Sequence, residues 1–597
     1  MSAATAPSAP VVRPGLRRLV GYLSRHRLAY GFWAILTLGY VASFVTIPIL
    51  IGRALGAAEQ GLPASEIALR CGFIVAVTLF AAALRYYSRT LVFNLARDIE
   101  YELRNDLFSH LQRLPQSFYL RWRTGDLMSR CVNDLASVRL LLGPGVLNLL
   151  QTPILYLAVF VAMFVLDPKL ALFVVLPYPA FLWIARAFGR AMYRTNLRLQ
   201  EGLADLSNRL QESVAGVAVV KAYAMERANQ ERFEVANRDL YERQIAVVRV
   251  MAALQPVLTL LPAVAMGIVF VVGGREVIDR RMSIADFFTF SMYVYGLTFY
   301  TFLMGWVVTL VQRGAASMQR LDDVLCTEPS IADRPDAARL GGLRGEIEFR
   351  HLDFRYPGSD REPSLRDLSV RIPAGSTLGV VGPIGSGKST LASVVPRLYE
   401  VPDGTVFLDG VDVNRIPLAT LRRNIAMVPQ ESFLFSMSLA ENVAYGLAEP
   451  DPERIHAAAE RAQLARDVAD LPYGWDTLVG ERGVMLSGGQ RQRTALARAL
   501  ALDPRILILD DALSSVDAET ESRIRSGLRE VFAERTVILI SHRISTVRDT
   551  DQIIVLDGGR IVERGRHDEL VAAGGLYARL ASQQALEEEI ESEEAVA

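Results

Sequence analysis

The stretch GPIGSGKST, residues 382–390, matches the phosphate-binding loop G-x-x-x-x-G-K-S/T. An apolar, strand-like segment (STLGVVG) leads into the loop and a helix-like segment (STLASVVPRLY) leaves it, which is the context that such a loop needs. Its glycines let backbone N–H groups turn toward phosphate oxygens, Lys388 would pair with the β- and γ-phosphates, and Ser389 would ligate Mg²⁺. The candidate nucleotide-binding residues of the loop are Gly382, Gly385, Ser386, Gly387, Lys388, Ser389 and Thr390.

Two further segments narrow the kind of nucleotide-binding domain. The run RILILDD at 505–511 has the pattern of a buried parallel strand that ends in two acidic residues, of which Asp510 would bind the Mg²⁺ shell. A phosphate loop by itself is compatible with a kinase, a GTPase or a helicase. The segment LSGGQRQRTALARAL at 486–500 decides among them, because it places Ser487 and two glycines at the start of a strongly helical stretch, where a phosphate can be received.

With these segments the sequence closely resembles the ATP-binding cassette transporters, whose signature motif is LSGGQ. The resemblance covers roughly residues 15–580 and implies an α/β P-loop cassette with a helical subdomain, which binds ATP and Mg²⁺. The segment VGERG at 479–483 resembles one unique to exporters, and FYLRWRTGDLMSR at 118–130 resembles their first coupling helix. The family therefore implies an exporter in which the membrane domain and the cassette share one chain.

The resemblance also implies roles for residues outside the phosphate loop. Gln430, in MVPQESFLF, looks like the Q-loop glutamine that senses Mg²⁺, and His542, in ISHR, looks like the switch histidine. Tyr356, in FRYPG, is similar to the aromatic residue that stacks on adenine, and SSVD at 514–517 is similar to the D-loop. The implied catalytic residues are Asp511, His542 and Gln430, and the implied Mg²⁺ ligands are Ser389, Gln430 and Asp510. The other implied nucleotide contacts are Ser487, Gly488, Gly489, Gln490 and Asp517.

The N-terminal half has the composition of a membrane domain. The hydrophobic fraction of the chain is 51% and its mean hydropathy is +0.23. A spanning helix needs about 20 mostly apolar residues, and long segments of this half meet that requirement. We expect six membrane-spanning helices, at 28–52, 71–89, 140–166, 170–190, 250–274 and 287–312.

Basic residues in the loops predict the orientation of this domain. Arginines are concentrated before the first predicted span and between the second and third, and Arg and Lys are enriched in cytoplasmic loops. An even number of spans then leaves both chain ends in the cytoplasm, as expected for a multi-pass protein of the cytoplasmic membrane of a bacterium. The connections at about 95–139 and 190–245 are polar and helical in pattern, so the spanning helices should continue into the cytoplasm. Arg85 and Arg89 share one helix face and either line a substrate path or snorkel to the cytoplasmic boundary.

Composition argues against several other functions. The formal net charge is -1, so nothing in the overall charge favours binding to nucleic acid. The three cysteines, Cys71, Cys131 and Cys326, are far apart, which argues against a disulfide framework or a zinc site. The predicted domains are an N-terminal cytoplasmic segment, a six-helix membrane domain, a linker, a cassette and an acidic tail, at 1–27, 28–325, 326–344, 345–580 and 581–597.

In the family, two cassettes face each other head to tail, and each ATP lies between the phosphate loop of one and the signature motif of the other. Because this chain has one cassette, the resemblance implies that it acts as a dimer by ATP-driven alternating access. The expected contacts outside the protein are membrane lipid and a small hydrophobic or amphipathic substrate, which the sequence does not identify. A cassette-gated channel or regulator is an alternative function.

One position departs from the family pattern. The family usually has Glu directly after the acidic residue of the 505–511 strand, where it acts as general base, and this chain has Asp511. Because aspartate is one methylene shorter, we expect the attacking water to be poorly held and hydrolysis at this site to be slow. The sequence therefore suggests the Asp-bearing subunit of a heterodimer, whose partner supplies Glu at the matching position. A homodimer with two slow sites is the competing interpretation.

Overall fold

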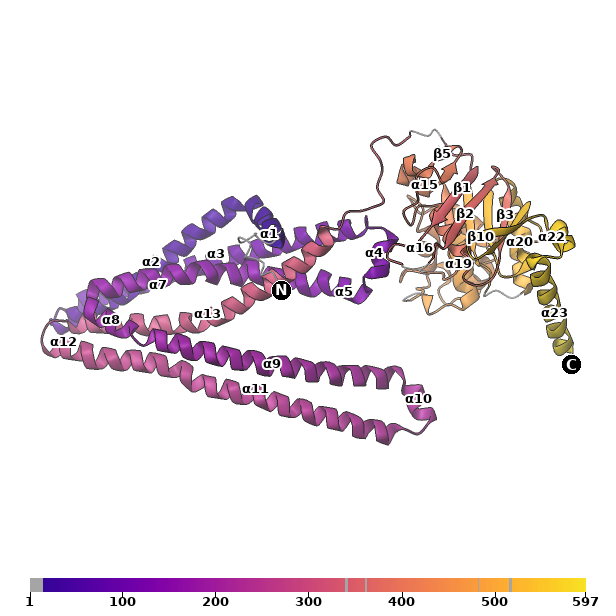
Figure 1. The fold of residues 1–597 in the computed structure, drawn as a ribbon. Coiled ribbons are helices and arrows are strands. Elements are labelled where there is room, and N and C mark those ends of the chain that lie inside the picture. Colours follow the sequence, from indigo (N-terminus) through magenta and orange to yellow (C-terminus); the bar gives the residue numbers. More distant parts are fainter. Residues whose placement is uncertain (1–13, 339–341, 360–361, 481–482, 515–517, 597) are drawn as a thin grey trace, which may run out of the picture. The chain divides into compact units, whose positions relative to one another are not determined.

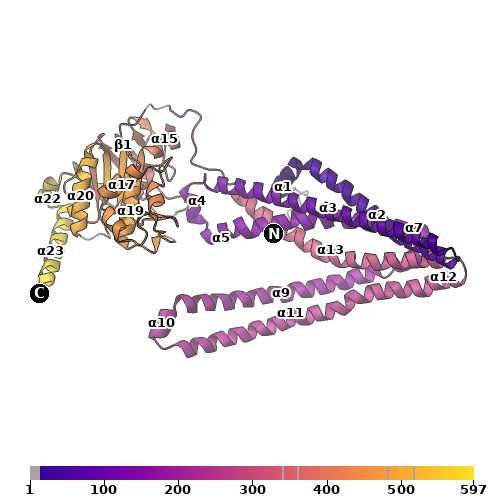
Figure 2. The same ribbon diagram turned by 180° about the vertical axis from the view of Figure 1, so that it is seen from behind.

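The computed structural model describes residues 14–596, apart from 339–341, 360–361, 481–482 and 515–517. The chain divides into two compact units, one of residues 1–111 and 125–326 and the other of residues 112–124 and 327–597. Asp517 and the middle of the VGERG segment therefore lie outside the described residues. Figures 1 and 2 show both units from opposite sides.

All regular secondary structure in the described part of the first unit is helical. Several of its helices are far longer than a bilayer requires: α3 has 48 residues, or about 72 Å at 1.5 Å per residue, against a hydrocarbon core of about 30 Å. Between 124 and 166 the helix is continuous but contains two π-helical turns, at Arg130–Asp134 and Leu141–Gly145. The main helices are α1 (Pro14–Arg25), α2 (Arg27–Glu59), α3 (Ala64–Leu111), α5 (Thr124–Ser129), α6 (Leu135–Leu140), α7 (Val146–Leu166), α8 (Pro168–Val175), α9 (Tyr178–Ala215), α10 (Val217–Ala222), α11 (Glu226–Ile268), α12 (Gly274–Ile278) and α13 (Ile284–Leu325).

The long polar connections predicted as helical extensions are helices. α3 continues to Leu111, and α9 and α11 pack along each other as a long hairpin that α10 closes at its tip (Figures 1 and 2). The N-terminal basic stretch also forms a helix, α1, which packs on α13 and buries Leu19 and Tyr22. The hydroxyl of Tyr22 donates a hydrogen bond to Asp106 of α3 at 2.5 Å.

The six-span prediction is not confirmed. In the described part of the chain, four helical stretches are long and apolar enough to cross a membrane, namely Arg27–Glu59, Ala64–Leu111, Thr124–Leu166 and Glu226–Ile278. The predicted span at 170–190 is divided, since α8 ends at Val175 and α9 begins at Tyr178, after Pro177. The predicted span at 287–312 lies within α13.

A partly buried ion pair ties α13 to the first π-helical turn. The carboxylate of Asp134 is 5% exposed, and Arg320 Nε donates to its Oδ2 at 2.9 Å. Arg320 also donates to the Ser317 hydroxyl at 3.0 Å. The pair therefore joins two segments that are 186 positions apart in the sequence.

We expect Arg320→Gln to destabilise the first unit by about 2 kcal/mol, because it leaves the Asp134 carboxylate buried without its counter-charge. Thermal unfolding of the full chain in detergent measures the effect. The control is Arg281→Gln, which breaks a wider and more exposed ion pair with Glu276, 3.9 Å across, and should change stability by less than about 0.5 kcal/mol. Equal shifts for the two variants would contradict the prediction.

The second unit is built on two sheets. The larger sheet has the order β10-β9-β3-β8-β7-β6, and all of its neighbouring pairs are parallel except β10 with β9. The smaller sheet is antiparallel, in the order β2-β1-β4-β5. The strands are β1 (Ile347–Phe354), β2 (Leu365–Ile372), β3 (Thr377–Val381), β4 (Val406–Leu408), β5 (Val411–Asp412), β6 (Ile425–Val428), β7 (Ile506–Asp510), β8 (Thr536–Ile540), β9 (Gln552–Asp557) and β10 (Arg560–Gly565).

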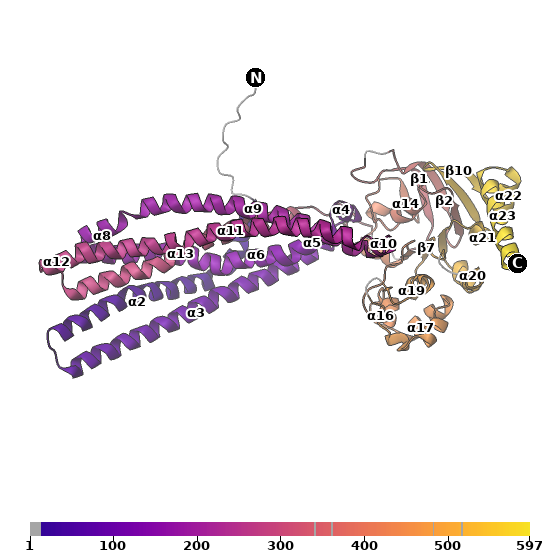
Figure 3. The same cartoon turned by 90° about the horizontal axis from the view of Figure 1, so that it is seen from below.

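Some helices of this unit cover the large sheet, and others form a separate group at one side. Figure 3 shows α16, α17 and α19 gathered away from β1 and β2. β7 and β8 are buried at every position, which agrees with the continuous apolar pattern expected of central parallel strands. The helices of this unit are α4 (Gln116–Arg121), α14 (Lys388–Val394), α15 (Leu418–Arg423), α16 (Leu439–Ala444), α17 (Pro452–Arg461), α18 (Ala465–Asp470), α19 (Gly488–Ala501), α20 (Ala518–Ala533), α21 (Ile544–Val547), α22 (His567–Ala573) and α23 (Leu576–Val596).

The short helix α4 belongs to this second unit although it comes from the N-terminal half of the sequence. A Cβ placed on Gly358 would lie 3.5 Å from the Arg121 Nε, so the end of α4 lies against the loop that follows β1. The segment that resembles a coupling helix is thus divided, because α4 groups with the cassette and α5 lies in the helical unit.

Candidate functional site

The phosphate loop joins β3 to α14 at the carboxyl end of the parallel sheet, where open α/β sheets bind their ligands. Two of its glycines are required by the fold. Gly382 has φ +149° and a Cβ there would lie 2.1 Å from the Leu556 carbonyl oxygen. Gly387 has φ +101° and a Cβ there would lie 2.6 Å from the Ser364 carbonyl oxygen. Any other residue would push the loop away from the strand beside it.

Lys388 is buried at the centre of the loop. Its Nζ donates to the carbonyl oxygens of Gly382 and Pro383, both at 2.8 Å. Burial lowers the pKa of this lysine, while the nearby carboxylates of Asp510 and Asp511 act in the opposite direction. Because these carbonyls are neutral acceptors, the ammonium group can exchange them for the charged oxygens of a phosphate.

The neighbouring Ser386 supplies a test of whether a phosphate group fits. Its side chain is 3% exposed, and its Oγ is buried with no hydrogen-bond partner in the described part of the chain. A buried hydroxyl without a partner is costly and calls for a missing acceptor. The loop therefore fits a nucleotide phosphate. The side chains beside it suit Mg²⁺ as well, since a hydroxyl and carboxylates are the oxygen ligands that this ion prefers.

Asp510 and Asp511 stand at the carboxyl end of β7, next to the loop. Asp510 is 4% exposed and accepts a hydrogen bond from the Ser389 side chain. Burial raises the pKa of Asp510, the Ser389 hydrogen bond opposes this, and the Asp511 charge adds to it. Ser389 and Asp510, both predicted to ligate Mg²⁺, thus lie together, and the bound ion would supply charge neutralisation for the phosphates.

Asp511 has an unusual backbone and, among the described residues, one long side-chain contact that bears on its role. Its φ is +52°, in the left-handed region, and its N–H donates to the Ile540 carbonyl oxygen at 2.9 Å. Gln430 Nε2 lies 3.5 Å from Asp511 Oδ2. The structure therefore brings together Gln430 and Asp511, which are 81 positions apart in the sequence, at the place where the attacking water is expected.

Tyr356 lies at the outer side of the phosphate loop. Its hydroxyl and that of Thr390 are 3.0 Å apart, and its ring packs edge-on against Tyr399 at a centroid distance of 5.0 Å. The ring is partly exposed. Its position beside α14 is consistent with the predicted stacking on adenine, because one part of the ring remains open to a ligand.

His542 follows β8 and is exposed, while its backbone is held by a residue that the sequence did not single out. The side chain of Gln584, in α23, donates to the His542 carbonyl oxygen and accepts from the Ile544 N–H at 2.7 Å. Nothing in the sequence near 584 marks this glutamine, because it stands at the start of what was predicted to be an acidic tail.

The signature segment begins α19. The Ser487 Oγ accepts from the Gln490 N–H at 3.2 Å, and the Ser487 N–H donates to the Gln490 Oε1 at 3.0 Å, which is a reciprocal capping box. Gln490 was predicted to contact nucleotide, but its amide oxygen is engaged in this cap. Ser487 is exposed, and the glycines after it are partly exposed, so the start of the helix is accessible to a ligand from outside the chain.

The phosphate loop and the signature segment are attached to different cores. Leu391, in the helix after the loop, packs in one hydrophobic cluster with the small sheet. Leu496 and Leu500 of α19 pack in another cluster with α16 and α17. The signature helix nevertheless touches the segment after β7, because the Gln492 side chain donates to the Ser514 hydroxyl at 3.0 Å.

In the helical unit, Arg85 lies above an aromatic pair. Its guanidinium carbon is 5.8 Å from the centroid of the Tyr40 ring, and the hydroxyls of Tyr40 and Tyr300 are 3.1 Å apart. Tyr293 donates to the Val45 carbonyl oxygen at 2.7 Å. These polar contacts join α2, α3 and α13 within the apolar interior.

Comparison with known proteins shows that both halves of the chain match models of ABC transporters. The family model for the ABC transporter transmembrane region matches residues 31–302, and that for the ABC transporter cassette matches residues 365–514. The Escherichia coli protein named multidrug resistance-like ATP-binding protein MdlA is 35% identical over 562 residues, covering 92% of this chain and 94% of that protein. An ATP-dependent lipid A-core flippase of Aromatoleum aromaticum is 34% identical over 589 residues, covering 96% of each.

A solved structure shares the whole architecture. The structure of a bacterial Atm1-family ABC exporter with ATP bound superposes with a TM-score of 0.79, at 29% identity, and covers 94% of this chain and 98% of that one. The similarity extends through the long helical hairpins and the two sheets, not only through the nucleotide-binding motifs.

Proposed function

Because the chain belongs to the ABC transporters, as an exporter half-transporter with a helical membrane domain and one ATP-hydrolysing cassette, we propose that it is the subunit of a heterodimer that holds the weaker ATP site. Exporters of this family act as dimers, and relatives of this chain carry names of multidrug and lipid exporters. The proposed cargo is a small hydrophobic or amphipathic molecule, exported across the cytoplasmic membrane of a bacterium.

The observation that carries the proposal is the short carboxylate of Asp511. A general base must come within about 2.6–3.2 Å of the atom that carries the proton it removes. Asp511 contacts Gln430 only at 3.5 Å, at the end of a short side chain and on a left-handed backbone. The chain's own phosphate loop would then hold ATP for long periods and hydrolyse it slowly.

The proposal also requires that the signature segment of this chain cover an ATP molecule on the partner subunit, and that segment is accessible. Ser487, Gly488 and Gly489 lie at the start of α19 and can cover an ATP bound to the phosphate loop of a partner. The partner would have Glu at the position of Asp511 and would carry out most of the hydrolysis. ATP binding would close the two cassettes together, and the movement would pass through α4 and α10 to the membrane helices.

We further propose the membrane spans, the domain boundaries and the roles of cassette residues that the sequence predicts. Six spans, two of them formed by α8 with α9 and by α13, would keep both chain ends in the cytoplasm. The domains would be 1–27, 28–325, 326–344, 345–580 and 581–597. Within the cassette, Tyr356 would stack on adenine, Ser389, Gln430 and Asp510 would surround Mg²⁺, and His542 would act in catalysis as the switch histidine.

Purification of the chain alone and together with a co-encoded half-transporter tests the proposal. We expect slow ATP hydrolysis by the chain alone, much faster hydrolysis by the pair, and export of hydrophobic dyes into inverted vesicles only by the pair. Strong ATP hydrolysis by the chain alone that Asp511→Ala leaves unchanged would contradict it. Equal dye export by the chain alone would instead support a homodimer with two slow sites.

A further inference from the structure

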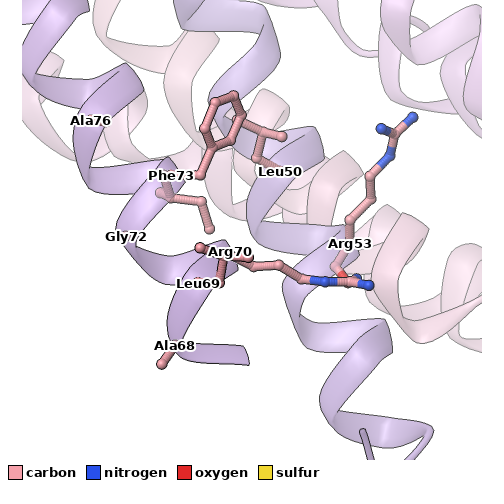
Figure 4. Close-up of a pocket in the computed structure, with 9 residues that line it drawn as sticks. Leu50, Arg53, Ala68, Leu69, Arg70, Gly72, Phe73 and Ala76 are labelled. Carbon is pink, nitrogen blue, oxygen red and sulfur yellow. The ribbon is translucent and has the colours of Figure 1, made fainter. Parts of the chain in front are cut away.

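A pocket opens between α2 and α3 close to the turn that joins them. Its volume is about 910 Å³, and it is lined by Leu50 and Arg53 of α2 and by seven residues of α3, namely Ala68, Leu69, Arg70, Gly72, Phe73, Ile74 and Ala76 (Figure 4). Most of the lining is apolar, and Leu69 and Phe73 are 76% and 58% exposed. Because α2 and α3 are both long and apolar enough to span a membrane, we expect these exposed side chains to face lipid.

Two arginines lie in this otherwise apolar pocket. Arg70 reaches from α3 toward α2, where its Nη1 donates to the Arg53 carbonyl oxygen at 3.2 Å (Figure 4). Neither guanidinium group forms an ion pair with any carboxylate among the described residues, although Glu59 and Glu66 belong to the same two helices. The pocket therefore offers nearly all the N–H donors of two cations to a ligand.

We propose that this pocket binds the headgroup of an anionic phospholipid, with the phosphate between Arg53 and Arg70 and an acyl chain along Leu69 and Phe73. Arginine suits this role because its planar fork pairs with phosphate oxygens and stays charged at the edge of a bilayer. An apolar lining that includes two arginines favours an amphipathic anion over a neutral lipid and over a free phosphate. The site is distinct from the nucleotide site and does not depend on the identity of the exported substrate.

Lipid titration of the purified full-length chain in detergent tests this site. Phosphatidylglycerol should raise the thermal unfolding temperature more than phosphatidylcholine does, and native mass spectrometry should detect retained phosphatidylglycerol. Arg53→Gln/Arg70→Gln should weaken phosphatidylglycerol retention about tenfold or more. Arg53→Lys/Arg70→Lys should give an intermediate loss, because it keeps the charges and removes the planar forks.

The control, Arg275→Gln/Arg281→Gln, removes the same number of positive charges outside the pocket and should retain phosphatidylglycerol as the unmodified chain does. Equal retention of the two lipids by the unmodified chain overturns the proposal. So does an equal loss in the control variant, since binding would then reflect overall charge. Inorganic phosphate that competes for the site without a lipid tail would also overturn it.

A separate observation concerns the segment after β8. The carboxamide of Gln584 spans the backbone on both sides of Arg543, because it donates to the His542 carbonyl oxygen and accepts from the Ile544 N–H. On the other side, the buried Glu521 of α20 accepts hydrogen bonds from the Arg543 guanidinium and, at 2.6 Å, from the Thr546 hydroxyl. Residues 542–546 are thus held between α20 and the C-terminal helix α23.

We infer that Gln584 is a positioning residue for His542. The imidazole is exposed, so its position depends on the backbone that carries it. A single carboxamide that satisfies the groups before and after Arg543 restricts that backbone, because its NH₂ group donates while its oxygen accepts. This inference rests on the proposed role of His542 in hydrolysis and makes α23 part of the same machinery.

ATP hydrolysis by the full chain, measured in the unmodified and His542→Ala backgrounds, tests the inference. Gln584→Ala should lower kcat about fivefold to tenfold, leave KM for ATP unchanged, and have no further effect when His542 is already Ala. Gln584→Asn keeps both hydrogen-bonding groups on a shorter side chain and should restore part of kcat. The control, Ser582→Ala, changes an exposed residue of the same helix and should have no effect.

An unchanged kcat in Gln584→Ala overturns the inference, and so does a loss that multiplies with that of His542→Ala. A fall in thermal stability that accounts for the loss of activity would also overturn it, since Gln584 would then act only on folding. If the proposed role of His542 is wrong, the His542→Ala variant alone would hydrolyse ATP normally. That outcome is distinguishable from a failure of the inference about Gln584.

Discussion

Lys388→Ala is expected to reduce ATP binding and hydrolysis at the chain's own phosphate loop by roughly a thousandfold or more. Hydrogen bonds to charged groups contribute about 1.5–3 kcal/mol each, and this ammonium group would serve two phosphates. Lys388 is 6% exposed and lies inside the loop, so no other side chain of the loop can supply its charge. Binding of a fluorescent ATP analogue and steady-state hydrolysis measure the two effects.

Lys388→Arg should be nearly as damaging, which makes it an informative second variant. The Lys388 ammonium fits between the carbonyl oxygens of Gly382 and Pro383, each 2.8 Å away, and a planar guanidinium group is too wide for that space. The control is Lys169→Ala, since Lys169 is exposed and lies near the start of α8. Full ATP binding in Lys388→Ala would contradict the assignment of the loop.

Asp511→Glu should increase ATP hydrolysis by the purified chain about tenfold or more. The added methylene extends the carboxylate by about 1.5 Å, which brings it into the range at which a base can accept a proton from water. Asp511 sits beside Gln430, so the longer side chain would still have a polar neighbour to orient it. Hydrolysis rates at saturating ATP, compared with those of the unmodified chain and of Asp511→Asn, measure the change.

The backbone conformation of Asp511 should make the more active Asp511→Glu variant less stable. Its φ is +52°, and Asp and Asn occupy the left-handed region more often than other residues with side chains. We therefore expect Asp511→Glu to lower thermal stability slightly while it raises activity. Asp511→Asn should hydrolyse ATP at nearly the rate of the unmodified chain if Asp511 is a poor base. A large loss in Asp511→Asn, with no gain in Asp511→Glu, would show that aspartate already performs the task.

Most of the candidate site was proposed from local sequence patterns. The phosphate loop, the acidic end of β7 and the cap of α19 each lie within a short segment, and the hydrogen bonds that shape them are local. The structure adds one further local contact: the amide oxygen of Gln490, in the signature motif, caps the helix, and its predicted contact with nucleotide stays a prediction. The predicted contact of Asp517 falls outside the described residues and stays a prediction.

Patterns of hydropathy were less reliable for the membrane half. Helices were expected in the right places, including the polar extensions, because a helical period continues whether the helix lies in lipid or in water. The predicted number of six spans is not confirmed in the same way, because four helical stretches of the described residues meet the criteria of length and hydropathy. The segment at 170–190 is apolar at its start and charged at its end, and the interruption at Leu176 and Pro177 divides it between two helices.

The order of residues along the chain determined which chemistry each segment can offer: glycines and a lysine at the spacing of a phosphate-binding loop, and an aspartate where the family usually has a glutamate. The folded chain decided which segments meet. It brings Gln430 to Asp511, Gln584 to the backbone of His542, and Arg70 to Arg53. No local pattern contains these pairs, because a hydrogen bond depends on distance in space, and residues far apart in sequence come close only when sheets and helices pack.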